Sequence, residues 1–442
     1  MVEMSRTGSL TAGVIALGLL AGCSGGAGSG NAAGAGATQT SGVTITVAYF
    51  MDSPPQAALD EFKKESGITV KWSNIDFDSL QTKIAAAATA KTYFADATDV
   101  DWSRVGQIAK LNWFYPVSQF IDTKVLAPEM PQLSSFTAAN GQVVAIPLDA
   151  AFLVTTTNKK LFARAGITKN PTTIAQYTDD LKQIKARGLQ YPLNIPFAAA
   201  EGLSTYWYQT TAAFGGTVLD GKGKPQFTTP DSAGYKAAQF MVDAIKTGLV
   251  PPGNINVSDS QGQQTLMAKG VVASTFADYS GNIGSLYDVP ASSSVVKDVQ
   301  YLPTPGVTGP EVNVGNPDGI GIPRTAKYPA AAAKFIQWIT SAKNQADFAG
   351  VSGPGKVWAG YFIPSRTPAV AQLTAKGTLI GGAQLNALLK TARPVFPGGA
   401  PSYYPEFSRA AYTNLHAAAT GSITVEAAVK AIADVANRLS AS

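Results

Sequence analysis

Cys23 is the residue of this chain with the most specific chemistry open to it. It is the only cysteine, and it follows residues 20–22 (Leu-Ala-Gly) at the end of an apolar run that begins at Thr11. A lipoprotein signal peptidase requires small side chains before the cleaved bond and a thiol after it, because the sulfur carries the diacylglyceryl group. The pattern predicts a signal peptide over residues 1–22 and lipidation of Cys23. The alternatives are a plain signal peptide with an incidental Cys, or a membrane span, for which the run is shorter than the roughly 20 residues required.

Carboxylate pairs are the next candidates for chemistry. Asp76 with Asp78, or Asp99 with Asp101, raise the alternative of a glycosidase, but a spacing of two in the sequence sets no acid–base geometry. His416 is the only histidine and no Gly-x-Ser-x-Gly motif occurs, which argues against a catalytic triad. Zinc-type His/Cys clusters, an EF-hand pattern and a phosphate-binding loop are also missing from the sequence. We therefore expect a protein that is not an enzyme and that needs no metal or cofactor.

Charge and length narrow the class further. Lys and Arg total 34 and Asp and Glu total 29, giving a net charge of +5 in a chain that is 14% charged. No basic run with interleaved aromatic residues is present, so nucleic acid is not an expected partner. The 442 residues, or 420 without the predicted signal peptide, exceed the roughly 250–300 residues that one core supports. The length predicts two lobes.

Local patterns predict how the elements follow one another. Residues 24–42 are small and uncharged, which is typical of a flexible tether. Strand-like runs at 43–50 and 68–72, and a third that ends near Asp101, alternate with helical patterns, one of them expected to be capped by Asp78. This alternation predicts a mainly parallel sheet covered by helices. The β-branched run 152–157 is long enough to cross from one lobe to the other.

Several segments, in this order, resemble the extracellular solute-binding proteins of ABC importers, above all the carbohydrate-binding family that includes the maltodextrin and trehalose/maltose binders. The resemblance extends colinearly from Val43 to Leu439. The segments that carry it are Ala95-Asp96 with Asp101-Trp102 and residues 105–109, residues 141–147 with 157–162, Phe214-Gly215-Gly216, residues 302–306, residues 330–339, Ala392-Arg393-Pro394 and residues 421–428.

The resemblance implies an α/β fold of two lobes, the type II periplasmic-binding-protein-like arrangement. Lobe one would comprise residues 43–151 plus 304–357, and lobe two residues 152–303 plus 358–442. A sugar or oligosaccharide would bind in the cleft between them, and hinge closure would trap it for delivery to the permease of an ABC importer. A monomer anchored outside the cytoplasm by lipid on Cys23 is expected. The alternatives are a same-fold receptor for another polar solute, such as a glycerophosphodiester, or a secreted glycan-acting enzyme.

A sugar site needs fixed polar groups and flat aromatic rings on loops at strand ends. These criteria and the resemblance select the candidates, and several of them also have a structural explanation. Asp52 could instead stand at a helix N-terminus, and Trp102 and Tyr206 could pack in the core. Asp149 could form a hinge salt bridge, and Arg393 an interlobe ion pair. The full set of expected ligand-binding residues is Asp52, Asp101, Trp102, Asp149, Tyr206, Trp207, Phe276, Asp278, Tyr279, Asp318, Gly319 and Arg393.

The chain also departs from a maltodextrin binder at two places. Ala151 stands where that binder has a ligand-touching Glu, and Ser408 lies near the position of one of its sugar-stacking Trp residues. The resemblance therefore implies the fold and the class of protein without implying the identity of the ligand.

Overall fold

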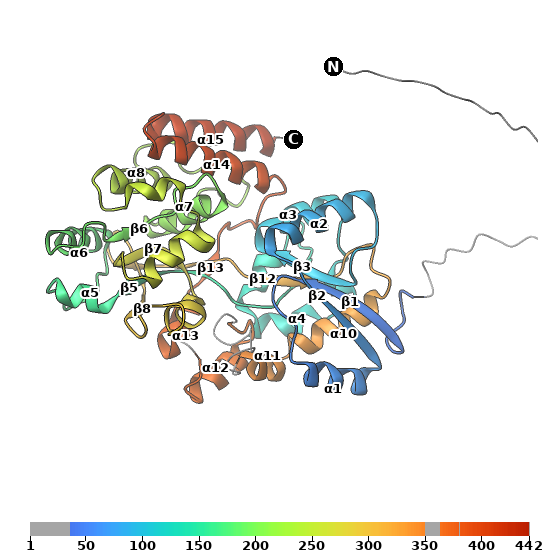
Figure 1. Ribbon diagram of the computed structural model, residues 1–442. Coiled ribbons are helices and arrows are strands. Elements are labelled where there is room, and N and C mark those ends of the chain that lie inside the picture. Colours follow the sequence, from blue (N-terminus) through green and yellow to red (C-terminus); the bar gives the residue numbers. More distant parts are fainter. Residues whose placement is uncertain (1–35, 350–362, 380, 442) are drawn as a thin grey trace, which may run out of the picture.

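The computed structural model describes residues 36–349, 363–379 and 381–441. Cys23, the predicted signal peptide and most of the predicted tether lie outside these ranges. The described chain forms two lobes, each with its own β-sheet and its own helices (Figure 1). The predicted two-lobe α/β fold is confirmed. We call the part built on the five-stranded sheet the first lobe and the part built on the four-stranded sheet the second lobe.

The sheet of the first lobe is mixed rather than mainly parallel. Its strand order is β2-β1-β3-β12-β4, with β1 parallel to β2 and β3 and with β12 antiparallel to β3 and β4. The antiparallel strand β12 lies more than 200 positions after β3 in the sequence, so no local pattern could predict that the two strands pair. The strands are β1 (Val43–Tyr49), β2 (Ile68–Asn74), β3 (Ala97–Asp101), β4 (Ile146–Pro147) and β12 (Asp318–Gly321).

The helices of the first lobe begin and end at residues whose chemistry explains the boundary. Gly67 takes the left-handed conformation, φ 72°, directly after α1, and its N–H bonds to the carbonyl of Lys63. Asp76 rather than Asp78 caps α2, because its side chain accepts the N–H of Ser79. The helices are α1 (Gln56–Ser66), α2 (Phe77–Ala90), α3 (Val105–Leu111), α4 (Thr123–Leu126), α10 (Pro329–Ile339) and α11 (Ala342–Ala349).

The sheet of the second lobe has the order β6-β7-β5-β8, and β5 runs antiparallel to both of its neighbours. Every residue of β5 is buried, so this strand forms the centre of the lobe. The strands are β5 (Leu153–Asn158), β6 (Leu193–Asn194), β7 (Ser274–Tyr279) and β8 (Val299–Leu302), with the short pair β9 (Thr304–Pro305) and β10 (Pro310–Glu311).

Helices from two separated parts of the chain complete the second lobe. α14 and α15 pack beside α7 and α8 at one end, and α12 and α13 lie at the other (Figure 1). Thr424 caps the amphipathic helix α15, because its side chain accepts the N–H of Ala427. The helices are α5 (Lys159–Arg164), α6 (Ile174–Ala186), α7 (Glu201–Ala213), α8 (Ala233–Lys246), α9 (Gln264–Ala268), α12 (Thr367–Ala375), α13 (Gly382–Leu389), α14 (Tyr404–Ala419) and α15 (Val425–Ser440).

The chain crosses between the lobes more than once. The first crossing enters β5 directly after Asp149, and a return crossing enters β12. The two lie side by side, because Phe152 bridges to Gly315 and the N–H of Asn316 bonds to the carbonyl of Ala151 at 3.0 Å. A further crossing pairs β13 (Arg393–Pro394) with β11 (Val314–Gly315) in parallel. The lobe boundaries predicted from the sequence remain a proposal.

Across the described ranges, no helix combines the length and the apolar character that crossing a bilayer would take.

Gly319 on β12 shows how tightly the first lobe is packed. A Cβ at this position would lie 2.6 Å from Cε1 of Phe136, whose ring is fully buried. We therefore predict that Gly319→Ala lowers the free energy of unfolding by about 1–3 kcal/mol, the usual cost of overpacking. Urea unfolding of the purified protein checks this. The matched control is Gly309→Ala, because a Cβ there meets nothing within 4 Å; equal losses for both variants would contradict the packing argument.

Candidate functional site

Three aspartates gather where β3 ends and β12 begins. Asp99 and Asp101 are two residues apart on β3, so their side chains share one face of the sheet. Asp318, the first residue of β12, pairs directly with Asp101 in the antiparallel register. Directly opposed residues of an antiparallel pair point to the same face. The sheet therefore places the three carboxylates together.

Asp149 adds a fourth carboxylate from the segment that leaves β4. Its Oδ1 accepts the backbone N–H of Asp318 at 2.9 Å and that of Ala151 at 3.3 Å. The residue is only 3% exposed. Burial raises the pKa of Asp149 to about 7, although the two backbone hydrogen bonds act in the opposite direction. A proton held near neutral pH is thus part of this site.

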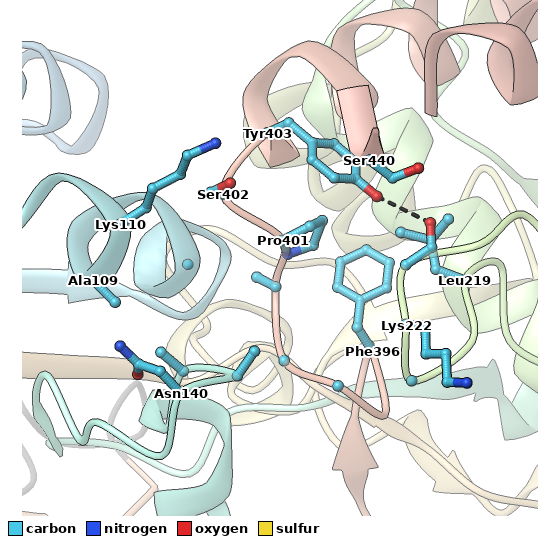
Figure 2. Close-up of a pocket in the computed structure, with 18 of the residues that line it drawn as sticks. Ala109, Lys110, Asn140, Leu219, Lys222, Phe396, Pro401, Ser402, Tyr403 and Ser440 are labelled. Atoms are coloured by element: carbon cyan, nitrogen blue, oxygen red, sulfur yellow. Dashed lines mark hydrogen bonds between the residues drawn. The ribbon is translucent and has the colours of Figure 1, made fainter. Parts of the chain in front are cut away.

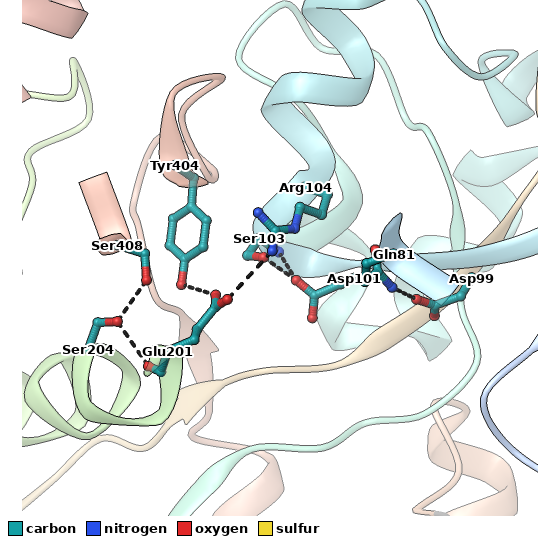
Figure 3. A network of polar contacts seen from close by, with 9 residues as sticks. All are labelled: Gln81, Asp99, Asp101, Ser103, Arg104, Glu201, Ser204, Tyr404 and Ser408. Atoms are coloured by element: carbon teal, nitrogen blue, oxygen red, sulfur yellow. Dashed lines mark hydrogen bonds and ion pairs between the residues drawn. The ribbon is translucent and has the colours of Figure 1, made fainter. Parts of the chain in front are cut away.

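Asp99 is the most deeply buried member of the group, at 1% exposure. The side-chain amide of Gln81 donates to its Oδ2 at 2.5 Å (Figure 3). Burial, and then the negative charge of Asp101, raise the pKa of Asp99 well above its usual range. Oδ1 of Asp99 and Oδ1 of Asp318 are both buried without a hydrogen-bond partner. Buried acceptors of this kind are uncommon and call for an explanation.

Asp101 connects the aspartates to the second lobe. Its Oδ1 accepts the N–H of Ser103 at 2.8 Å and also the hydroxyl of Ser103. These two bonds cap the 3₁₀ turn Trp102–Arg104, which follows Asp101 directly. Arg104 on that turn reaches across to the second lobe, where its Nη2 lies 3.5 Å from Oε2 of Glu201. The hydroxyl of Tyr404 donates to Oε1 of the same Glu201 at 2.6 Å (Figure 3). Polar side chains of both lobes therefore meet here.

An apolar contact accompanies this polar bridge. Trp102 is 6% exposed and belongs to a hydrophobic cluster made mainly of second-lobe residues. Its ring centroid lies 5.4 Å from that of Tyr404 and 6.0 Å from that of Phe396. A Cβ at Gly106 on α3 would lie 2.8 Å from the backbone N of Ser402, so the lobes touch closely beside it. In this structure the two lobes are in contact.

A hollow of about 390 Å³ opens next to this contact (Figure 2). α3 and the turn 138–140 line it from the first lobe, and the hairpin 219–223 and the loop 396–403 line it from the second. Its polar side chains include Lys110, Asn140 and Lys222, and the hydroxyl of Tyr403 at its edge donates to the carbonyl of Gly223 at 3.0 Å. The hollow shares no lining residue with the aspartate group.

A family model described as a bacterial extracellular solute-binding protein matches residues 47–346, more than half of the chain. The chain belongs to this family. Among curated proteins, one from Brucella abortus (strain 2308), named only as a binding protein, is 24% identical over 343 residues. That alignment covers 75% of this chain and 77% of the relative.

Solved structures show the same fold for this solute-binding protein. Maltose-bound MalE3 of T. maritima is 23% identical with a TM-score of 0.75, covering 90% of this chain and 100% of its own. The ribitol complex of an ABC transporter solute-binding protein of Agrobacterium radiobacter K84 is 24% identical with a TM-score of 0.74, covering 90% and 99%. The cyclic α-maltosyl-1,6-maltose binding protein of Arthrobacter globiformis is 21% identical with a TM-score of 0.70, covering 90% and 98%.

Of the residues expected to bind ligand, the structure brings together Asp101, Trp102, Asp149 and Asp318. Asp52 lies partly exposed after β1, and its Oδ1 accepts the side-chain amide of Asn74 at 2.5 Å. It is therefore held against the end of β2, as a first-lobe residue near the edge of the sheet.

Several other candidates lie in the core of the second lobe. Trp207 is fully buried, its Nε1 donates to the carbonyl of Gly234 at 2.8 Å, and its ring meets Phe227 at 4.9 Å. Tyr206 is 1% exposed, and its hydroxyl accepts the N–H of Phe276 at 3.1 Å. Phe276 itself is fully buried. These rings offer no accessible face to a sugar, so we leave them out of the site.

Asp278 and Tyr279 have partners within the second lobe. Asp278 is 1% exposed and accepts hydrogen bonds from Thr156, Asn282 and Tyr287. Tyr279 is half-buried and donates to Asp259 at 2.5 Å. Asp278 therefore organises the lobe interior, since its oxygens are already occupied.

Gly319 and Arg393 also have structural surroundings that differ from the expectation. Gly319 is buried under Phe136, which accounts for the glycine by packing. Arg393 is exposed on β13, and within the described ranges no carboxylate lies within 4 Å of it, so the interlobe ion pair is not formed here. Two other ion pairs join the lobes: Arg104 with Glu201, and Arg366, directly before α12, with Glu129 of the first lobe.

The sequence interpretation missed Arg104, Glu201 and Tyr404 as site residues and considered Asp99 only as half of a glycosidase pair. The strand period could have added Asp99, because residues two apart on a strand share a face. Glu201 and Tyr404 are about 200 positions apart in the sequence, and nothing local indicates that they meet. Across the described ranges, no group of three or more His, Cys, Asp or Glu is arranged to hold a metal ion.

Trp207 permits a direct test of these assignments. Truncation to Ala would leave a large cavity between α7 and α8 and would remove the hydrogen bond to Gly234. We predict that Trp207→Ala lowers the free energy of unfolding by about 3–5 kcal/mol, as for other buried aromatic residues. Val307→Ala is the control, because Val307 is 56% exposed and should change stability by less than about 0.5 kcal/mol. If Trp207→Ala is as stable as the parent, the core assignment is wrong and Trp207 is again a candidate ligand-binding residue.

Proposed function

We propose that this solute-binding protein captures a polyhydroxylated solute, a sugar or a polyol, between its lobes and presents it to the permease of an ABC importer. The observation that carries the proposal is the aspartate group at the end of β3 and β12, with Glu201 and Tyr404 approaching from the second lobe. Carboxylates accept hydrogen bonds from hydroxyl groups, and a ring of fixed acceptors suits a ligand rich in hydroxyls. Same-fold proteins bound to maltose, ribitol and D-mannitol support this class of ligand.

The two-lobe arrangement gives the capture its mechanism. A ligand that touches groups on both lobes binds the closed form better than the open form, and so it shifts the population toward closure. Asp101 and Arg104 stand on the first lobe and Glu201 and Tyr404 on the second, within one polar network (Figure 3). Closure around a solute would therefore build on a contact that the protein already forms.

The charge of the site favours this reading over a glycerophosphodiester receptor. A phosphodiester is anionic and calls for a cation, but the cation beside these aspartates in the described part of the protein, Arg104, is already paired with Glu201. The glycan-acting enzyme reading would require two carboxylates on opposite sides of a scissile bond. The four aspartates stand together on the first lobe, and the carboxylate that faces them from the second lobe, Glu201, is already engaged by Arg104 and Tyr404.

A ligand panel tests the proposal. We expect the mature protein to show saturable calorimetric heat and a raised melting temperature with at least one of maltose, ribitol and D-mannitol, because a ligand of the folded state stabilises it. Chromatography of the mixture after incubation should recover the ligand unchanged. Products of cleavage would favour the enzyme instead, and the lack of binding by the whole panel would count against a sugar or polyol receptor.

Asp101→Asn should weaken the binding of that ligand by about 1.5–3 kcal/mol, the scale of a hydrogen bond to a charged group. The fold should survive, because Asn serves as well as Asp in accepting the N–H of Ser103. Calorimetry measures the affinity and thermal unfolding measures the stability. Asp231→Asn, a change at a fully exposed side chain, is the control and should leave the affinity unchanged; an unchanged affinity in Asp101→Asn would remove this residue from the site.

Lipid anchoring at Cys23 is a separate part of the proposal and rests on the sequence alone. We predict that Cys23→Ala abolishes incorporation of labelled fatty acid and moves the protein from the membrane fraction to the soluble fraction. Its melting temperature should match that of the parent, because residue 23 precedes β1 by 20 positions. Cys23→Ala protein that stays in the membrane fraction through a high-salt wash would contradict the anchor.

A further inference from the structure

We infer that the solute carries a positive charge: a polyhydroxylated amine, such as an amino sugar or an amino polyol, with its ammonium group held among Asp99, Asp101, Asp149 and Asp318. This inference rests on the proposed function and narrows it from hydroxylated solutes in general to cationic ones. It follows from the charges, the unpartnered atoms and the protonation of the site.

The charges around the aspartates do not balance within the described part of the protein. The four carboxylates come from β3, β12 and the crossing after β4, and they lie close enough to raise one another's pKa. Arg104 is the cation that acts on them, through Asp101, and Glu201 pairs with it from the second lobe. Tyr49, from β1, presents a neutral phenol whose pKa is raised well above its usual value by burial and by these carboxylates. One more cation would offset an excess of buried negative charge.

The unpartnered atoms at this sheet edge are acceptors. Oδ1 of Asp99 and Oδ1 of Asp318 are buried and receive no hydrogen bond. Asp99 is 1% exposed, and its other oxygen, Oδ2, accepts only the side-chain amide of Gln81 among the hydrogen bonds of the described residues. An ammonium group supplies three donors, whereas a hydroxyl supplies one.

The raised pKa values of these carboxyl groups link ligand binding to protonation. Burial raises the pKa of Asp149 to about 7 and that of Asp99 and Asp318 well above the usual range. A bound cation favours the ionised carboxylates, so binding would release protons, and the affinity would fall as pH drops through about 7. A neutral polyol would not require this release. The two kinds of ligand therefore differ in the size of the pH dependence of their affinity.

Matched probe pairs test the inference on the whole mature chain. The pairs are 1-amino-1-deoxy-D-sorbitol with D-sorbitol, D-glucosamine with D-glucose, and the dimer of β-1,4-linked glucosamine with its N-acetylated form. Calorimetry at pH 7.5 should show at least one amine probe binding at least tenfold more tightly than its neutral partner. The preference should shrink between pH 7.5 and pH 5, and heats in buffers of different ionisation enthalpy should show proton release.

Two charge-removing variants localise the effect. Asp318→Asn and Asp99→Asn keep the size of the side chain and should each reduce the amine preference at least fivefold. Asp231→Asn is the surface control and should keep the full preference. Thermal unfolding shows whether each variant folds. If one of the two does not fold, the other still tests the inference.

The outcomes separate the two levels of the proposal. If neutral probes bind as tightly as their amine partners, or if the amine preference survives both variants, the cationic ligand is overturned and the sugar or polyol receptor stands. If Ca²⁺ or Mg²⁺ alone binds and no amine does, the aspartates serve a metal ion and the inference also fails. If neither the probe pairs nor maltose, ribitol and D-mannitol bind, the proposed function fails with it.

Discussion

The gathering of four carboxylates where β3 ends and β12 begins, two of them buried and two half-buried, is the constraint on which the rest of this structure depends. Removing such groups from water is costly unless they are paired or protonated. The fold offsets part of that cost with the amide of Gln81 on Asp99 and with two backbone N–H groups on Asp149. Two aspartate oxygens remain without partners. Because packing alone gives no reason to retain such atoms, their arrangement points to recognition of a ligand.

The contact between the lobes depends on the same edge. Asp101 fixes the turn that carries Trp102 and Arg104, since it accepts both donors of Ser103. Trp102 then packs on second-lobe rings, and Arg104 pairs with Glu201. Asp101 therefore belongs both to the aspartate group and to the surface through which the lobes meet, so in the proposed function binding and closure would share residues.

The sequence was sufficient for the elements whose signals are local. The apolar run of β1, the stop at Gly67 and the placement of Asp101 and Trp102 at a strand end all follow from neighbouring residues. The errors concern distant pairing. β12 enters the first sheet antiparallel, and this assembles the site by setting Asp318 opposite Asp101. α7 is buried on nearly all sides, so a local pattern could not show that Trp207 faces the core instead of a cleft.

The surroundings of Ser408 differ from those expected at this position of a maltodextrin binder. Where such a binder is expected to offer a Trp ring, the hydroxyl of Ser408 meets that of Ser204 at 2.7 Å in a buried contact. Tyr404 lies one turn earlier on α14. Its ring packs against Trp102, and its hydroxyl donates a hydrogen bond to Glu201. These aromatic rings hold the lobes together, which leaves them little surface for stacking on a sugar. If the proposed site is correct, its carboxylates would identify the ligand, and selectivity would rest on hydrogen-bond donors and charge more than on ring stacking.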